Sequence, residues 1–179
     1  MPEANLLMII GQEGAGKSTT VRALGEATPS SGRLDAEDVA ATNPWQMDEA
    51  FLQLLWKNVA DVTRNFWEAG YQTVIAGSFA SNIGHYHAFR EILNRDANVY
   101  VVQLCAGKPV RNVRRIERGK ATSEEWRDMV DRVDPEDTTF ASSATNGEYR
   151  FLRIDIEGTS VADTIERIRQ WAPELYEVR

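Results

Sequence analysis

The sequence has a single cysteine, fewer basic than acidic residues and no long apolar run. The one cysteine, Cys105, excludes a disulfide within the chain, and its position in a predicted strand indicates a buried, unreactive thiol. No apolar stretch approaches the roughly 20 residues that a membrane helix needs, and the first apolar run does not follow basic residues as it does in a signal peptide. We therefore expect a cytoplasmic protein without a membrane partner.

The charge and the length restrict the partners and the number of domains. A formal net charge of -7 and an isoelectric point near 4.9 argue against nucleic acid as a partner, because general nucleic-acid binders are basic. The 179 residues contain no repeat, linker or low-complexity tract, so we expect one domain over residues 1–179. The sequence gives no indication of the oligomeric state.

One glycine-rich stretch matches a phosphate-binding motif. Residues 11–18, GQEGAGKS, fit G-x-x-x-x-G-K-S without a mismatch, and a chance match is expected in about one chain of this length in a hundred, or fewer. An apolar run at 6–10 predicts a buried strand before the motif, and 17–27 predicts a helix after it. We expect Lys17 to bridge the β- and γ-phosphates of a nucleotide and Ser18 to bind Mg²⁺. The predicted nucleotide-binding residues are Gly11, Gln12, Glu13, Gly14, Ala15, Gly16, Lys17, Ser18 and Thr19.

Strand and helix patterns alternate along the rest of the chain. Further strands are predicted at 33–35, 71–76, 98–105 and 148–156, and helices at about 48–69, 85–95, 109–118, 123–133 and 161–171, with a polar loop at 138–147. This alternation predicts an α/β protein of three layers, with a parallel sheet between helices and a ligand site at the carboxyl ends of the strands.

Two polar residues are predicted at that edge of the sheet. Asp35 ends the second strand, where its carboxylate is suited to orienting an acceptor hydroxyl or to holding the shell of a magnesium ion. The competing interpretation is an N-cap of the segment that follows. Ser78 follows a glycine at the end of the third strand, which fits a substrate contact or a polar turn equally well.

The helix at 48–69 has an unusually wide apolar face. An inward stripe of Phe51, Leu55, Val59, Val62 and Phe66 is accompanied by a second stripe of Leu52, Trp56, Ala60, Thr63 and Trp67. One contact with a sheet does not need both stripes. We therefore consider Trp56 a candidate for lining an acceptor pocket, although buried aromatic residues belong to the core more often than to a binding surface.

Four arginines lie within eight residues after the fourth strand: Arg111, Arg114, Arg115 and Arg118. Such a run usually forms a solvated basic face. Its place after a central strand in an acidic protein indicates instead a helical lid at about 108–135. There Arg115 and Arg118, three residues apart on one side of a helix, contact phosphate. His85 and His87 lack any metal-ligand spacing and are expected at a surface or a helix start.

These motifs together resemble those of the P-loop small-molecule kinases of adenylate-kinase-like architecture. That group includes the shikimate, gluconate, adenylylsulfate and chloramphenicol phosphotransferase families. The resemblance rests on residues 11–18, on LDAED at 34–38, on RIERG at 115–119 and on the closing stretch 154–168, and it spans nearly the whole chain.

The resemblance implies the sheet order 2-3-1-4-5 and transfer of the γ-phosphate of ATP, with Mg²⁺, to a small acceptor. Lys17, Arg115 and Arg118 would act on the phosphates, Asp35 as base or magnesium partner, and Glu37 or Asp38 near the acceptor. The chain departs from the pattern at Glu37 in place of a second Asp, at Ala40 in place of an Arg and at Ala76 in place of an Asp. These departures leave the acceptor and the magnesium shell open.

Other functions stay open beside the kinase. A GTPase switch would use Asp155 and Gly158 as D-x-x-G, but this motif comes after the last strand and the chain has no Asn-Lys dipeptide for guanine recognition. A kinase of polynucleotide 5′ ends is disfavoured by the acidic charge, whereas a nucleotide-sugar kinase is indistinguishable from the first hypothesis. A non-catalytic nucleotide-binding protein is kept open by Ala76.

Overall fold

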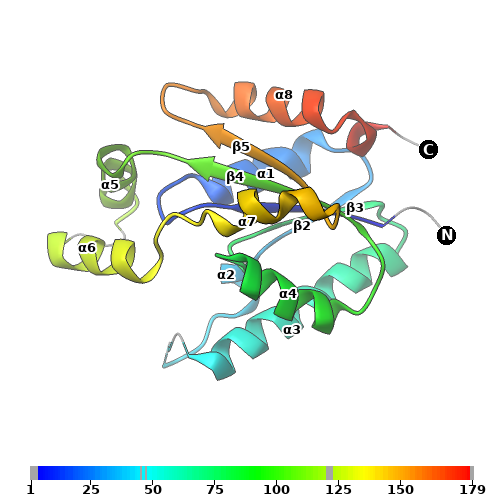
Figure 1. Cartoon of the computed structure of the whole chain (residues 1–179), viewed down its shortest axis with the longest axis horizontal. Coiled ribbons are helices and arrows are strands. Elements are labelled where there is room, and N and C mark those ends of the chain that lie inside the picture. Colours follow the sequence, from blue (N-terminus) through cyan, green and yellow to red (C-terminus); the bar gives the residue numbers. More distant parts are fainter. Residues whose placement is uncertain (1–3, 45, 47, 120–122, 178–179) are drawn as a thin grey trace.

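A computed structural model describes residues 4–44, 46, 48–119 and 123–177. It contains one sheet of five strands, all parallel, in the order β2-β3-β1-β4-β5 (Figure 1). This is the predicted order 2-3-1-4-5. The strands are β1 (Asn5–Ile10), β2 (Ser31–Asp35), β3 (Thr73–Gly77), β4 (Asn98–Cys105) and β5 (Arg150–Asp155).

Helices cover both faces of the sheet, as the alternating pattern predicted. On one face α1 and α8 pack against Leu7 and Ile9, and on the other α3 and α4 pack against Leu6 and Met8 (Figure 1). Consecutive residues of β1 thus point into different halves of the core, which explains its uninterrupted apolar sequence. The helices are α1 (Lys17–Ala27), α2 (Ala36–Val39), α3 (Glu49–Glu68), α4 (Ile83–Leu93), α5 (Lys108–Glu117), α6 (Glu124–Val133), α7 (Thr139–Ser143) and α8 (Val161–Trp171), with 3₁₀ turns at Ala144–Asn146 and Pro173–Tyr176.

The prediction of a loop at 138–147 is wrong, because this segment forms α7 and a 3₁₀ turn. Phe140 is fully buried against the α4 side of the core, and its carbonyl oxygen accepts a hydrogen bond of 2.7 Å from the Tyr149 hydroxyl. The Asp137 carboxylate accepts from the Phe140 N–H at 3.0 Å and so caps the turn. One buried aromatic side chain therefore fixes a segment that has an otherwise polar sequence.

Long helix α3 buries more of the second predicted stripe than of the first. Trp56 and Trp67 are 5% and 4% exposed, whereas Phe51 and Phe66 are only partly buried. Their indole N–H groups donate to main-chain carbonyl oxygens, that of Trp56 to Phe79 at 2.8 Å and that of Trp67 to Asn5 at 3.3 Å. Satisfied donors allow both rings to lie in the core.

Element boundaries elsewhere shift by about two residues. The Asn82 side chain accepts from the His85 N–H at 2.9 Å, so α4 begins at Ile83, two residues before the predicted start at about 85. Cys105 is buried as predicted, and burial raises the pKa of its thiol to about 11. Over the described residues, no helix combines the length and the apolar composition needed to cross a membrane.

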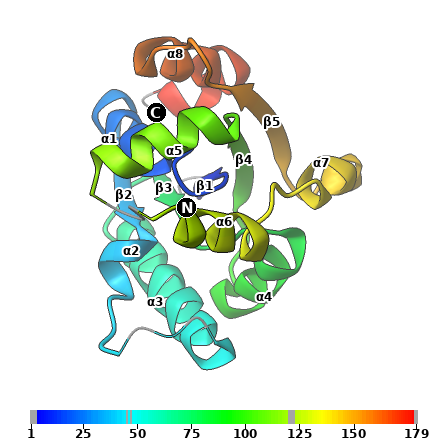
Figure 2. The same cartoon turned by 90° about the vertical axis from the view of Figure 1, so that its left-hand side faces the viewer.

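At the carboxyl ends of the strands, α5 and α6 lie side by side beyond the edge of the sheet (Figures 1 and 2). Ser123 caps α6 by accepting from the Trp126 N–H at 3.2 Å. The predicted lid at about 108–135 corresponds to these two helices, except that Lys120, Ala121 and Thr122 lie outside the described residues. No residue of α6 is buried, and its apolar Trp126 and Val133 are 44% and 71% exposed.

Candidate functional site

The loop Gly11–Ser18, called the glycine-rich loop below, joins β1 to α1 at the carboxyl edge of the sheet. Gly14 and Gly16 have φ values of 83° and 85°, in the left-handed region that favours glycine. A Cβ atom on Gly14 would lie 2.8 Å from the Arg111 carbonyl oxygen, so α5 packs directly on the loop. The backbone of this loop therefore needs glycine both for its curvature and for its contact with α5.

Lys17 lies at the centre of the site. Its Nζ atom donates to the carbonyl oxygens of Gly11 at 2.6 Å and Gln12 at 3.1 Å. Burial lowers the pKa of Lys17, and the carboxylates of Asp134, Glu37, Asp35 and Glu13 act in the opposite direction. The ammonium group thus lies within electrostatic reach of acidic residues from three separate parts of the chain.

A narrow cavity joins the loop to residues that are distant in sequence. Its lining combines the predicted nucleotide-binding residues with polar side chains from α2, from the end of β3 and from α5: Glu13, Gly14, Gly16, Lys17, Ser18, Glu37, Ser78, Arg115 and Arg118. The fold therefore gathers most of the predicted site residues at one place. The remaining ones lie outside this lining: Gly11, Gln12, Ala15, Thr19, Asp35, Asp38 and Trp56.

Asp35 has one of the two roles that the sequence left as alternatives, that of an N-cap. It is 9% exposed at the end of β2, and its Oδ1 atom accepts from the Glu37 N–H at 3.3 Å as the N-cap of α2. Its carboxylate is also among the groups that influence the pKa of Lys17. Glu37 lines the cavity, whereas Asp38 is exposed.

Ser78 has two unusual features. Its φ of 68° lies in the left-handed region, which costs a residue with a Cβ atom about 1–2 kcal/mol relative to glycine. Its hydroxyl oxygen is buried and has no hydrogen-bond partner among the described residues. Backbone strain and an unsatisfied hydroxyl in the lining of the same cavity are typical of a ligand contact rather than of a polar turn.

Two arginines of α5, Arg111 and Arg115, turn toward the loop instead of solvent. Arg111 and Arg115 are only 5% and 2% exposed, so the interpretation as a solvated basic face is wrong for both. Arg118 donates from Nη2 to the Thr19 hydroxyl at 2.8 Å, which connects α5 to the first turn of α1. Arg115 and Arg118 both line the cavity, as expected for neighbours three residues apart.

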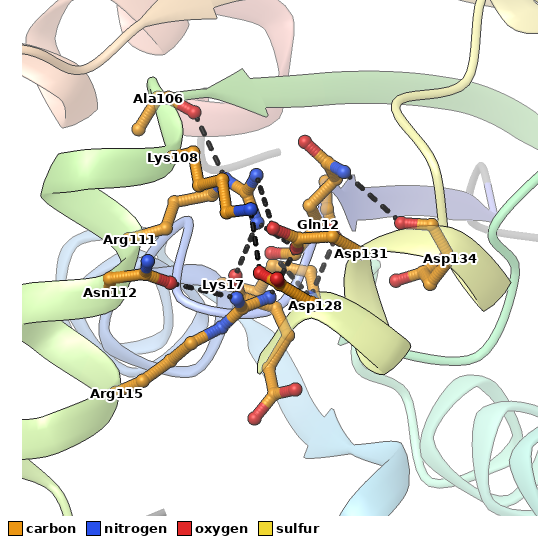
Figure 3. Close-up of polar contacts among 12 residues, drawn as sticks. Gln12, Lys17, Ala106, Lys108, Arg111, Asn112, Arg115, Asp128, Asp131 and Asp134 are labelled. Carbon is orange, nitrogen blue, oxygen red and sulfur yellow. Dashed lines mark hydrogen bonds and ion pairs between the residues drawn. The ribbon is translucent and has the colours of Figure 1, made fainter. Parts of the chain in front are cut away.

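Two aspartates of this site were not predicted from the sequence. The Asp131 Oδ1 atom accepts from Arg111 Nη1 at 2.6 Å and from Arg115 Nη2 at 2.8 Å (Figure 3). The Asp134 carbonyl oxygen accepts from the Gln12 side chain at 3.1 Å, which connects the end of α6 to the glycine-rich loop. Burial raises the pKa of Asp134, partly offset by the positive charge of Lys17.

A spacing in the sequence contained a signal for these contacts. Acidic residues recur every third position in Asp128, Asp131 and Asp134, and basic ones at similar intervals in Lys108, Arg111 and Arg115. Such spacing predicts two helices with facing charged sides. The helix expected at 123–133 ends before Asp134, and the expectation for it did not include a charged face toward the helix at 109–118.

His85 and Trp56 lie together, within electrostatic reach of Asp134. Their rings are 5.3 Å apart between centroids, and His85 Nδ1 is 3.1 Å from the Ser81 hydroxyl. Burial lowers the pKa of His85, and the negative charge of Asp134 offsets part of this shift. His85 is thus half-buried at the start of α4, whereas His87 is exposed and pairs with Glu148 at 3.3 Å.

Comparison with known proteins gives relatives in structure and none in sequence. No protein-family model matches the chain, and no curated protein matches it by sequence. A sugar kinase from a Janibacter species is similar with a TM-score of 0.71 and 15% identity over 99% of this chain and 100% of that one. A gluconokinase from Sinorhizobium meliloti gives 0.65 and 13% over 98% of each chain. Shikimate kinase from Acinetobacter baumannii gives 0.58 and 18% over 96% of this chain and 94% of that one. The chain therefore has the α/β fold of the P-loop small-molecule kinases over essentially its whole length.

Proposed function

We propose that the protein is an ATP-dependent kinase that transfers the γ-phosphate to a hydroxyl group of a small-molecule or nucleotide-like acceptor. One observation carries the proposal: Lys17, Ser78 and the guanidinium groups of Arg115 and Arg118 line a single cavity on the glycine-rich loop. Cationic groups around one small space suit the charge of a phosphoryl group in transfer. The sugar, gluconate and shikimate kinases that share the fold support a small acceptor.

The donor nucleotide is assigned to the glycine-rich loop and to Thr19. N–H groups of the loop and of the first turn of α1 point at phosphate in such an arrangement. The ammonium group of Lys17 exchanges its two carbonyl partners for β- and γ-phosphate oxygens. Arg115 and Arg118 then offset negative charge on the transferred group, and burial of Arg115 keeps that interaction strong.

We assign to Asp35 the role of the general base that takes the proton of the acceptor hydroxyl. As the acceptor oxygen bonds to the γ-phosphorus, the bond from phosphorus to the bridging oxygen of the leaving ADP breaks, and the hydroxyl proton passes to the Asp35 carboxylate. Glu37 and Ser78, which line the cavity, contact the acceptor. Asp38 is exposed. Trp56 lies in the core, and we assign it a packing role beneath the acceptor.

The residues of this site can supply one or two oxygen ligands to Mg²⁺. Within the described part of the chain, no group of three or more His, Cys, Asp or Glu side chains could hold a metal ion. Magnesium in kinases is held through phosphates, water and one or two protein oxygens, which Ser18 and Asp35 can supply. When bound, Mg²⁺ would supply positive charge to offset that of the phosphates. Asp35 would carry more of the protein's share of its ligands because Ala76 offers no carboxylate.

The alternatives have less support. Asp155 is the last residue of the edge strand β5, and Gly158 follows that strand. The Asp155 carboxylate accepts from the Glu157 N–H at 2.9 Å, and neither Asp155 nor Gly158 lines the cavity. A γ-phosphate sensor for a GTPase switch would have to reach that cavity. A non-catalytic nucleotide-binding protein would have no use for a strained Ser78 beside Lys17.

The test is ADP formation from Mg·ATP in the presence of neutral sugars, sugar acids, nucleosides, nucleotide sugars, amino alcohols and antibiotics, followed by mass spectrometry of each acceptor. We expect one class to gain a phosphoryl group, and GTP to be a poorer donor or no donor. Failure to bind Mg·ATP in a calorimetric titration would contradict the proposal. Binding without transfer to any acceptor would favour the non-catalytic alternative.

A further inference from the structure

Two arginines on successive turns of α5 converge on one carboxylate of α6. Arg111 and Arg115 donate to the same oxygen, Asp131 Oδ1, at 2.6 Å and 2.8 Å, and Arg111 also reaches Oδ2 at 3.4 Å (Figure 3). Only 14% of the Asp131 side chain is exposed. Burial alone would raise the pKa of Asp131, but its bonds to the two guanidinium groups outweigh burial and lower it. The carboxylate is therefore ionised and shared.

Both guanidinium groups lie against the glycine-rich loop. Arg111 donates from Nη1 to the Glu13 carbonyl oxygen at 3.4 Å and from Nε to that of Ala106 at 3.1 Å, so its donors are used within the protein. Arg115 lines the cavity together with Lys17. The shared carboxylate thus determines where two buried positive charges lie relative to the loop.

One nitrogen of the Arg115 guanidinium group has no hydrogen-bond partner among the described residues. Its Nη1 donates to the Asn112 side chain at 3.2 Å and its Nη2 to Asp131, whereas its Nε atom is buried without a partner among the described residues. A buried donor without a partner is costly. Because Arg115 also lines the cavity on the glycine-rich loop, a ligand oxygen there can serve as the missing acceptor.

We propose that Asp131 is a positioning residue, which holds the Arg115 guanidinium against the glycine-rich loop so that its free N–H binds the terminal phosphate of the nucleotide. This inference rests on the proposed function, because it takes a nucleoside triphosphate as the ligand of the loop. Asp131 acts through Arg115 and does not touch the phosphate. It therefore sets the preference of the site for ATP over ADP.

Asp128 offers a matched control one turn earlier on α6. Its Oδ1 atom accepts from Lys108 Nζ at 2.7 Å, so this pair also connects α6 to α5, but both side chains are about half exposed and neither lines the cavity. Asp128→Asn removes a contact between the helices and leaves the two arginines in place. Asp131→Asn removes the charge that orients them.

The experiment compares the affinities of Mg·ATP and Mg·ADP by calorimetric titration without an acceptor. We expect Asp131→Asn to lower the ATP-to-ADP affinity ratio roughly tenfold, the usual size of one charge-assisted hydrogen bond. Asp128→Asn should leave the ratio unchanged. A residue that is only structural would lower the melting temperature in either variant without changing the ratio.

Arg115→Gln keeps the inference testable if Asp131→Asn folds poorly, and a double-mutant cycle measures their coupling if it folds. Arg115→Gln should lower the ratio by itself, and Asp131→Asn added to it should change the ratio no further. An unchanged or raised ratio in Asp131→Asn, or an equal drop in both backgrounds, overturns the inference. If the wild-type protein binds no nucleotide, the proposed function fails, whereas binding with a ratio insensitive to Asp131 removes only the role of Asp131.

Discussion

The ammonium group of Lys17 donates a 2.6 Å hydrogen bond to the carbonyl oxygen of Gly11, so the lysine closes the glycine-rich loop on itself. The described hydrogen bonds of Lys17 are donated to main-chain carbonyl oxygens of the loop, so they do not join the loop to the rest of the fold. The charge of Lys17 thus contributes little to holding the fold, while burial of that charge has a cost, as its lowered pKa indicates.

Replacing Lys17 by alanine should weaken nucleotide binding and leave the fold intact. Loss of hydrogen bonds from a charged donor, worth about 1.5–3 kcal/mol, corresponds to an affinity for Mg·ATP reduced roughly 10- to 100-fold. The melting temperature should stay within a few degrees of wild type or rise. Lys57→Ala, at an exposed position on α3, is the control and should change neither quantity. Unaltered ATP binding in Lys17→Ala would remove the basis for placing the nucleotide on this loop.

Asp35→Asn should separate the two roles of Asp35. Asparagine keeps the N-cap of α2, because its carbonyl oxygen can accept from the Glu37 N–H, but it cannot take a proton from an acceptor. We expect turnover to fall by at least about 100-fold, the usual contribution of a general base, with a smaller change in Mg·ATP affinity.

The control for that substitution is Asp48→Asn, which changes another N-cap whose carboxylate accepts from the Phe51 N–H at 2.8 Å. It should leave turnover unchanged. Steady-state kinetics and a separate ATP titration measure the two effects. An equal loss of ATP affinity and turnover in Asp35→Asn would show that Asp35 acts through magnesium and not on the acceptor.

Ser78→Gly should make the protein more stable and less active. Removing a Cβ atom from a residue with a φ of 68° relieves about 1–2 kcal/mol of strain, which raises the melting temperature of a chain of this size by about 2–8 °C. The same substitution deletes a hydroxyl that we place on the acceptor. Ser30→Gly is matched, because Ser30 has a φ of 47° but is exposed at the opposite edge of the sheet. It should gain stability without losing activity, and parallel behaviour of the two variants would exclude a functional hydroxyl at Ser78.

Asp134→Asn should stabilise the protein at neutral pH and lose that advantage in acid. Burial raises the folded-state pKa of Asp134 above its ordinary value near 3.8. The ionised carboxylate therefore destabilises the folded state at any pH above the folded pKa, and the penalty vanishes once the pH falls below the unfolded value. Denaturant titrations between pH 3 and pH 8 measure the difference. A variant less stable than wild type at pH 7 would show that attraction to Lys17 outweighs burial.

Much of the fold follows from local sequence patterns. The apolar run of β1, the match of residues 11–18 to the motif and the alternation of strands and helices predict the parallel sheet and the place of its ligand edge. The failure at α7 has a local explanation, because a single Phe140 in a polar segment gives no periodicity. Its burial depends on Tyr149 and on the space beside α4, which no window of sequence contains.

The site at the carboxyl edge of the sheet likewise depends partly on local sequence and partly on the tertiary structure. The sequence by itself determined the glycine-rich loop with Lys17, since a motif of fixed spacing depends only on neighbouring residues. Only the tertiary structure decided that Arg115 faces the loop and shares Asp131 with Arg111, and that Asp134 approaches Lys17. It also decided that the Ser78 hydroxyl is buried without a partner among the described residues. These relations join residues far apart in the chain, and their energies depend on distance and burial, which exist only after the sheet has brought the ends of its strands together.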